Sequence, residues 1–254
     1  FSIQAQKTGK TVQVGGEAMY PMKNIVENAV NSKAHTTLVA AVKAAGLVET
    51  LQGAGPFTVF APDNTAFASA GITSSTVASL SATQLSDLLL YHTIGSKILA
   101  AGVPAGPNAK VITAGGDSVF VTKNASGVFV NGIAVAQADI AADNGVIHRL
   151  SKALNKPSGN IVQTAVAATG GDNGLDSLVV AVTTAGLGST LTNNTLTVFA
   201  PTNKAFRDLL SALGLPNIKS IPLSTLTAVL GYHVTVGRKF SSDLTAGSLA
   251  MFSG

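Results

Sequence analysis

The chain contains the pattern Thr-Val-Phe-Ala-Pro-x-Asn-x-Ala-Phe twice, as Thr58-Val59-Phe60-Ala61-Pro62-Asp63-Asn64-Thr65-Ala66-Phe67 and as Thr197-Val198-Phe199-Ala200-Pro201-Thr202-Asn203-Lys204-Ala205-Phe206. The second copy begins 139 residues after the first (197 − 58). In the first copy, the apolar run over 57–60 predicts a short buried strand that ends at Pro62. Asp63 or Asn64 can then cap a helix that runs through Phe67. The four phenylalanines at matching positions are predicted core residues: Phe60, Phe67, Phe199 and Phe206.

Two further blocks recur in the same order. The block 37–47 returns at 177–187, an offset of 140 (177 − 37), and Leu90-Tyr91-His92 returns as Gly231-Tyr232-His233, an offset of 141 (231 − 90). A period near 140 residues is far longer than a solenoid repeat. We therefore predict two duplicated domains, each with its own hydrophobic core.

Within the first copy, helical patterns precede strand patterns. Apolar spacing predicts a helix over 36–45, and Ser81-x-x-Gln84 is a capping box that starts a helix ending at Tyr91-His92. Short β-rich runs separated by turn residues follow, and Asn131-Gly132 is the strongest hairpin signal. The run 144–150 is typical of a closing strand. Helices followed by a meander of strands predict an α+β fold.

The composition excludes several classes of protein. Of the 254 residues, 46% are hydrophobic and 11% are charged, which supports a packed core and is typical of an exported protein. The net charge of +4 comes without a basic cluster, which argues against nucleic-acid binding. There is no cysteine, so disulfides and thiolate chemistry are excluded. No apolar run approaches the ~18 residues of a transmembrane helix, so we do not expect the chain to span a membrane.

The ordered motifs, together with Asn-Gly-x-Ile-His at 144–148, resemble the fasciclin-domain family. The resemblance implies two tandem fasciclin-like domains, each a β-wedge or sandwich with packed N-terminal helices. It also implies a role in adhesion and protein contact, and the opening 23–30 is similar to exported bacterial members. We expect an N-terminal extension at 1–20, in which 1–7 would be the remains of an export signal or an arm. The first domain is then expected at 21–156 and the second at 157–254.

The second copy departs from the family pattern. From Tyr91 to Leu154 the first copy has 63 residues (154 − 91), whereas only 22 follow Tyr232 (254 − 232). The hairpins and the Asn-Gly-x-Ile-His strand have no counterpart in the second copy. A sheet without its closing strands exposes unpaired edges. The expectation is that the chain is a fragment of a longer product, or that a partner covers the gap.

Candidate partner-binding residues lie in three places. The resemblance links the Tyr-His pairs, Tyr91-His92 and Tyr232-His233, to receptor binding in some animal members. The residues themselves favour core histidines with internal hydrogen bonds. Pro104 and Pro107 belong to a stiff, exposed Pro/Gly-rich loop over 101–107, which is a candidate contact surface.

No pattern assigns catalytic or metal-binding roles. There is no Gly-x-Ser-x-Gly elbow, and His148 lies in an alternating strand where we expect an internal partner. No His-x-x-x-His spacing occurs, and the run 171–176 has only part of a calcium loop, so we interpret it as a surface turn. We expect no catalytic residue, metal or cofactor.

Two hypotheses of function follow. The first is a non-catalytic module that binds or adheres through protein or glycan contacts. It would act outside the cell, on its surface or in the periplasm, or as an accessory subunit of a cell-envelope assembly. The alternative is a carrier or sensor of a small apolar ligand held between helices and sheet. An enclosed pocket favours the carrier, whereas an exposed patch favours the binding module.

Overall fold

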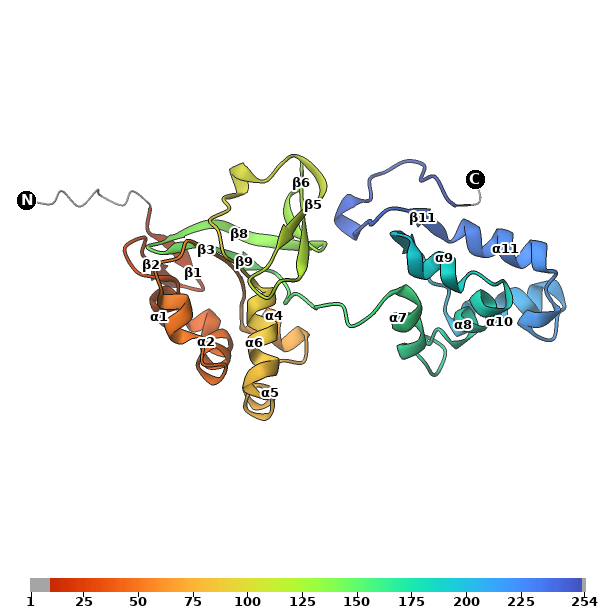
Figure 1. The fold of residues 1–254 in the computed structure, drawn as a ribbon, viewed down its shortest axis with the longest axis horizontal. Coiled ribbons are helices and arrows are strands. Elements are labelled where there is room, and N and C mark those ends of the chain that lie inside the picture. The colour runs from red at the N-terminus through yellow and green to blue at the C-terminus, as the bar shows by residue number, and fades with distance from the viewer. Residues whose placement is uncertain (1–9, 253–254) are drawn as a thin grey trace, which may run out of the picture. The chain divides into compact units, whose positions relative to one another are not determined.

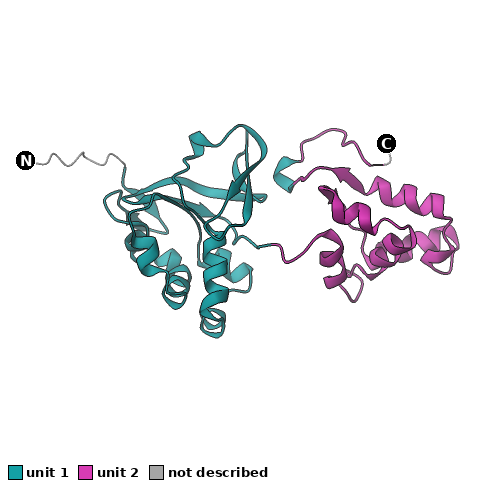
Figure 2. Ribbon diagram, viewed as in Figure 1, with its two compact units in different colours: residues 1–156, 240–243 teal, residues 157–239, 244–254 magenta. Residues whose placement is uncertain are grey.

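The computed structural model describes residues 10–252, which divide into two compact units (Figures 1 and 2). Within the described residues, unit 1 comprises 10–156 with Phe240–Asp243, and unit 2 comprises Pro157–Lys239 with 244–252. The export-signal remnant expected at 1–7 lies outside the described residues.

Unit 1 begins with a small hairpin, continues with helices and ends with strands. Its elements are β1 Val12–Val14, β2 Glu17–Met19, α1 Ile25–Asn31, α2 Thr36–Ala44, α3 Val48–Gln52, β3 Phe57–Pro62, α4 Asn64–Ser69, α5 Ser74–Ser79, α6 Ala82–Tyr91, β4 Thr93–Ile94, β5 Gly106–Ile112, β6 Ser118–Asn124, β7 Gly127–Val130, β8 Ile133–Ala142 and β9 Gly145–Leu150. Three 3₁₀ turns accompany them at Lys33–His35, Ala100–Gly102 and Ser241–Asp243. The predicted α+β order is confirmed.

The larger sheet of unit 1 has seven strands in the order β4-β3-β9-β8-β7-β6-β5. The β3–β9 pair is parallel, with Phe57 opposite Gly145 and Pro62 opposite Leu150. The other strand pairs of this sheet are antiparallel. Because β3 lies between two strands and is buried on both faces, its residues are apolar apart from Thr58 and show no alternation with polar ones. Helices α1, α2 and α6 lie on one side of the sheet (Figure 1).

Two hydrophobic clusters fill unit 1. One lies between the helices and the sheet and includes Phe67 and Leu85, which are fully buried. The other lies inside the curl of the strands and includes Phe60, Tyr91 and Leu150. The predicted core positions Phe60 and Phe67 are thus confirmed.

The local signals in the sequence account for the ends of these elements. Ser81 and Gln84 form the predicted capping box at the start of α6. Asp63, and not Asn64, caps α4 by accepting a hydrogen bond from the Ala66 N–H. Asn131 and Gly132 adopt φ values of 48° and 76°, the left-handed conformations of a two-residue hairpin turn between β7 and β8.

Unit 2 repeats the helical part of this plan. Its elements are α7 Ile161–Ala167, α8 Asp176–Thr184, α9 Gly188–Asn193, β10 Leu196–Val198, α10 Asn203–Leu213, α11 Leu223–Tyr232 and β11 Val234–Val236, with a 3₁₀ turn at Ile218–Ser220. One hydrophobic cluster lies among the helices and contains the predicted core residue Phe206. The two strands, β10 and β11, form an antiparallel pair.

The prediction for Phe199 is wrong, because its side chain is 40% exposed whereas that of Phe60 is 4% exposed. Strands β5 to β9 enclose Phe60 in the second cluster of unit 1. Within residues 157–252, β10 pairs with β11 alone, and no strand lies in the place that β9 takes beside β3. Phe199, the equivalent of Phe60, therefore lies at the end of a strand whose edge is open.

Candidate binding sites

The first Tyr-His pair lies at the end of α6 and is 1% exposed at both residues. The Tyr91 hydroxyl donates to the Ser118 carbonyl (3.3 Å) and accepts from the Asn131 side-chain amide (2.9 Å). His92 Nδ1 donates to the Leu88 carbonyl (2.8 Å), and Nε2 accepts from the Leu154 N–H (2.8 Å). Burial lowers the pKa of His92 to about 4, against the opposing effect of the Leu88 carbonyl. The expected core histidine is confirmed, and neither side chain reaches the surface of unit 1.

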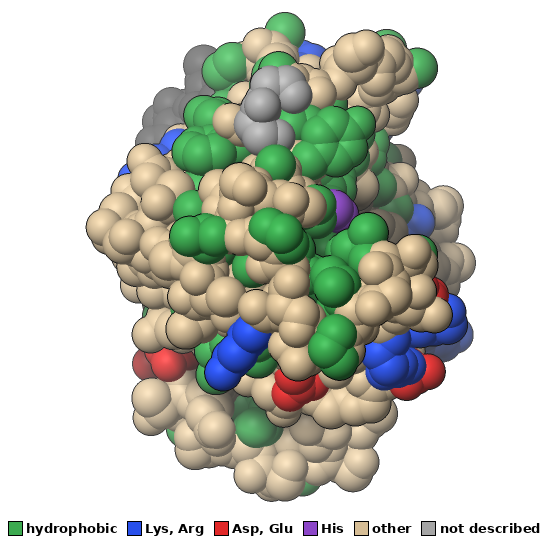
Figure 3. Space-filling model, turned by 90° about the vertical axis from the view of Figure 1, so that its right-hand side faces the viewer, with side chains coloured by type: hydrophobic (Ala, Val, Ile, Leu, Met, Phe, Trp, Pro, Cys, Tyr) green, Lys and Arg blue, Asp and Glu red, His purple; other side chains and the backbone are tan. Residues whose placement is uncertain are grey.

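The second Tyr-His pair has different surroundings. His233 Nδ1 donates to the Val229 carbonyl (2.7 Å), as His92 does to Leu88, but Tyr232 is 65% exposed. Large hydrophobic residues are exposed at several other positions of unit 2: Val166, Val180, Phe199, Leu213, Leu223, Val236, Leu244 and Phe252. Figure 3 shows hydrophobic side chains gathered over the centre of one face, where charged ones are few. Partner contact at Tyr232 and His233 stays a prediction.

The Pro/Gly-rich segment 101–107 is only partly the loop that was predicted, because Ala100–Gly102 forms a 3₁₀ turn and Gly106 and Pro107 begin β5. The loop itself spans residues 103–105. Pro104 and Pro107 are exposed, whereas Val103 is buried in the core inside the curled sheet. The Ala100 N–H donates to the Asp139 carboxylate (2.8 Å), and Lys123 Nζ donates to the Ala100 carbonyl (3.0 Å). A loop held in one shape loses little conformational entropy when it binds.

The remaining histidines are also internal. His148 Nδ1 accepts from the Asp139 N–H (3.2 Å) and its Nε2 donates to the Ile98 carbonyl (2.8 Å), so the expected internal partner is confirmed. Burial lowers the pKa of His148. Burial likewise lowers the pKa of His35 to about 4, with Asp63 opposing and Arg149 reinforcing the effect.

A serine does contact a histidine, but not as in a hydrolase. Ser32 Oγ lies 2.9 Å from Nδ1 of His35, both residues are 1% exposed, and Nε2 of His35 has no partner. A catalytic serine needs a base whose other nitrogen is oriented by a carboxylate, together with access for the substrate. This buried pair meets neither requirement.

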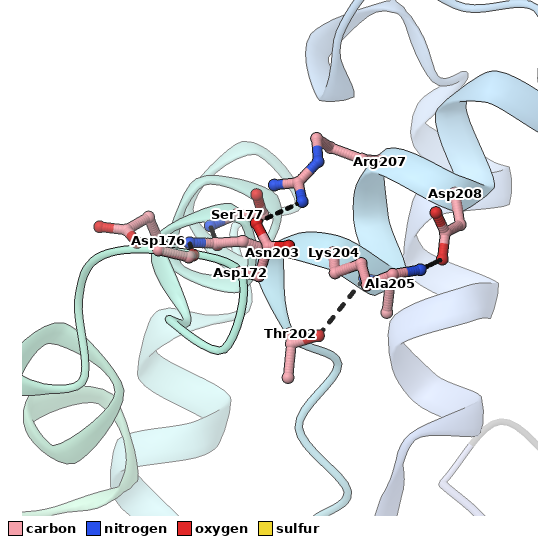
Figure 4. A network of polar contacts seen from close by, with 10 residues as sticks. Asp172, Asp176, Ser177, Thr202, Asn203, Lys204, Ala205, Arg207 and Asp208 are labelled. Carbon is pink, nitrogen blue, oxygen red and sulfur yellow. Dashed lines mark hydrogen bonds and ion pairs between the residues drawn. The ribbon is translucent and has the colours of Figure 1, made fainter.

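The run 171–176 forms a surface turn that leads into α8 at Asp176 and is closed by a polar network (Figure 4). The Asp176 carboxylate accepts from the Asn203 side-chain amide (2.6 Å) and the Gly170 N–H (2.9 Å). These two hydrogen bonds, that from Asn203 first, lower the pKa of Asp176. Asp172 pairs with Arg207 (2.6 Å). Both carboxylates are thus satisfied by donors from the protein. No group of His, Asp and Glu suited to a metal is found within residues 10–252.

The role of the repeated asparagine was not predicted from the sequence. Asn64 accepts from the Thr37 N–H (3.0 Å) and donates to the Lys33 carbonyl, and Asn203 accepts from the Ser177 N–H (2.8 Å) in the same way. Asn64 therefore fixes the start of α2, and Asn203 fixes the start of α8. The signal was available, since Asn is identical in both copies at the common offset of 139.

A fourth repeated block was also missed. Asn24-Ile25-Val26 returns as Asn160-Ile161-Val162, at an offset of 136 (160 − 24), and both asparagines form capping boxes, for α1 and α7. With this block, the two copies share their first three helices.

In each unit, a cavity lies between the first three helices and the strand that follows them. The first cavity has a volume of about 190 Å³ and is bounded by α1, α2, α3, β3 and the end of α6. The second cavity has about 80 Å³ and is bounded by α7, α8, α9, β10 and the end of α11. Nearly every residue that lines the second cavity has its equivalent in the first, as Leu178 has in Leu38 and His233 in His92. The arrangement can accept apolar groups.

In the described part of the chain, no helix is both long and apolar enough to cross a membrane.

Comparison with known proteins gives consistent matches. A family model described as "Fasciclin domain" matches residues 33–156 and 173–253. Protein sll1483 of Synechocystis sp. is 41% identical over 156 residues, which is 61% of this chain and 85% of that protein. Transforming growth factor-beta-induced protein ig-h3 of Sus scrofa is 36% identical over 138 residues, which is 54% of this chain and 20% of that protein.

One solved structure is a FAS1 domain pair from the insect cell adhesion molecule fasciclin I. The match covers 85% of this chain and 80% of that chain at 18% identity, with a TM-score of 0.43.

Proposed function

The chain belongs to the fasciclin-domain family, and from this premise we propose that it is a non-catalytic binding module that adheres through protein contacts. The family match covers both copies, so the chain carries two fasciclin domains in tandem. When one of two tandem domains is bound to a surface, the effective concentration of the other domain at that surface rises, so that weak contacts add up. We place the protein outside the cell, on the cell surface or in the periplasm, where it would serve alone or as an accessory subunit of an envelope assembly.

The observation that carries this proposal is the braced loop of unit 1. Pro104 in the loop and Pro107 at the start of β5 are both exposed, while Val103 is buried and Asp139 and Lys123 hold the backbone of Ala100. By contrast, Tyr91 and His92 are buried, so in unit 1 the loop is the better candidate for the contact. In unit 2 the exposed Tyr232 offers a second candidate. A glycan partner is a variant of the same proposal.

Adhesion is tested with beads coated with the chain at graded densities. We expect retention under flow on surfaces carrying matrix proteins, cell-wall glycans or whole cells, with a steep rise as the coating density increases. Albumin-coated beads are the control for nonspecific retention. Retention no greater than that of albumin on all of these surfaces would contradict the proposal.

The loop is tested by the double variant Pro104→Glu with Pro107→Glu. We expect it to lower retention several-fold, because two charges would be desolvated in the contact. The matched control is Ser126→Glu, which adds a charge at an exposed hairpin turn of the same unit. If the loop variant and the control adhere equally well, the contact lies elsewhere and Tyr232 is the next position to change.

A further inference from the structure

The first cavity is larger than ordinary packing leaves. Protein interiors contain few voids bigger than a water molecule. An apolar cavity of about 150 Å³ suffices to hold benzene. At about 190 Å³, the first cavity is large enough for the body of a small hydrophobic molecule.

The interior of the first cavity offers no free polar group, and the one amide side chain among its lining residues, Gln52, is exposed. Its walls are aliphatic side chains, among them Leu38, Val42 and Leu51. At its inner end, both nitrogens of His92 are engaged, and the Thr93 hydroxyl donates to the Leu89 carbonyl (2.9 Å). A polar ligand group here would lose its hydrogen bonds to water without replacement. The part of a ligand that enters must therefore be apolar.

The rim of the first cavity carries one positive charge. Lys43 is the charged residue among those that line it, is exposed, and forms no ion pair with any described residue. Val30, which also lines this cavity, is 57% exposed. At the equivalent rim position the second cavity has Thr183, and its volume is less than half as large. An apolar interior with a cation at its rim complements an amphiphile with an anionic head.

We propose that the first cavity binds a medium-chain hydrophobic carboxylate, with its acyl chain among the side chains of α1, α2 and α3 and its carboxylate beside Lys43. The second cavity has less than half this volume and has no lysine at its rim, so we expect it not to bind the carboxylate at concentrations that fill the first cavity. This site lies away from the Pro104–Pro107 loop along the chain and does not depend on the adhesion proposed above.

The probe is sodium octanoate, titrated into the full chain labelled at Leu and Val methyl groups and followed by NMR. We expect saturable shifts at Leu38, Val39 and Val42, and none at the equivalent Val179 and Val182. No saturable shift at the first set would overturn the proposal, since the cavity would then be a packing void. Shifts of equal size and midpoint in both units would overturn the assignment to the first cavity.

Blocking variants test the location. Val30→Trp obstructs the rim at an exposed position that tolerates substitution, and Ala29→Phe fills the interior. Each should weaken octanoate binding roughly tenfold or more, whereas Ala165→Phe, the matched change in the second cavity, should leave it unchanged. If Val30→Trp binds as tightly as the parent chain, the site is not this cavity.

The head group is tested with Lys43→Gln. It should weaken octanoate binding several-fold and leave the binding of 1-octanol unchanged, because only the carboxylate meets the charge. The reciprocal change Thr183→Lys adds the charge without the volume and should not create octanoate binding. Equal loss of both probes in Lys43→Gln would overturn the role of the charge. The bead assay remains a separate readout, so loss of octanoate binding with intact adhesion would overturn this inference alone.

Discussion

At the scale of single residues, the buried Asn144 joins segments that lie far apart in the sequence. Asn144 accepts from the Ile25 N–H (3.0 Å) at the start of α1 and donates to the carbonyls of Leu51 and Gly53 (both 2.8 Å) at the end of α3. Buried backbone groups need such partners because an unpaired group costs the full price of desolvation. The Asn-Gly-x-Ile-His motif is therefore explained by the architecture of unit 1, without appeal to a ligand.

Replacing Asn144 with Ala should lower the free energy of unfolding of unit 1 by about 3 kcal/mol, because it leaves one N–H and two carbonyls without their partner. Urea unfolding followed by pulse proteolysis, with fragments of the two units identified by mass spectrometry, measures the change. Asn155→Ala is the control, since Asn155 is exposed. A loss no larger than that of the control would contradict the joint role of Asn144.

Acid should destabilise unit 1 through its buried histidines. The pKa of His92 falls from 6.5 to about 4 in the folded state, because burial penalises the imidazolium. Between these two pH values the unfolded chain binds a proton that the folded unit does not, so stability is complete above pH 6.5 and declines as pH falls toward 4. The shift at His92 corresponds to about 3 kcal/mol, and His35 acts in the same direction.

The same urea series, repeated at several pH values from 7.5 to 4.5, measures this dependence. His92→Asn removes the titrating group and should flatten the slope for unit 1, even if it lowers the stability at neutral pH. A stability of unit 1 that does not change across this range would show that the histidines are already solvated.

At the scale of elements, the parallel pair β3–β9 closes the sheet of unit 1. The closure depends on a close backbone approach at Gly145, where a Cβ atom would collide with the Phe57 carbonyl. Glycine is needed here for space, since its φ does not lie in the left-handed region. The chain can thus return from the hairpins and lie against β3 over its whole length.

Gly145→Ala should lower the free energy of unfolding of unit 1 by about 2 kcal/mol, because the methyl group would push the two strands apart. Gly95→Ala is the matched control, since a Cβ there meets nothing within 4 Å. Hydrogen exchange of the β3 and β9 amides locates the effect. Equal protection in the two variants would contradict the close approach.

The elements also show what the sequence could and could not predict. Helix α2, the capping box of α6 and the Asn131-Gly132 turn were predictable, because caps, apolar spacing and turn chemistry act within a few residues. The parallel partner of β3 was not, since strand pairing across the chain leaves no local signal. For the same reason the cavities and the hydrogen bonds of Asn144 emerged only from the fold.

At the scale of the whole molecule, duplication has placed one motif in two environments. In unit 1, seven strands enclose Tyr91, whereas the sheet of unit 2 has two strands and leaves Tyr232 largely exposed. Two-stranded sheets contribute little stability of their own, so unit 2 depends on its helical core. The surroundings of each tyrosine, and not its identity, therefore decide how much it contributes to the stability of its unit.

This leads to a matched pair of substitutions in one chain. Tyr91→Ala should cost unit 1 about 4 kcal/mol, because it empties a buried site and removes the hydroxyl partner of Ser118 and Asn131. Tyr232→Ala should change the stability of unit 2 by about 0.5 kcal/mol or less, as surface substitutions do. Pulse proteolysis that reports each unit separately measures both changes. If Tyr232→Ala costs as much as Tyr91→Ala, something in solution covers Tyr232, and sedimentation of the parent chain will show whether a second copy does so.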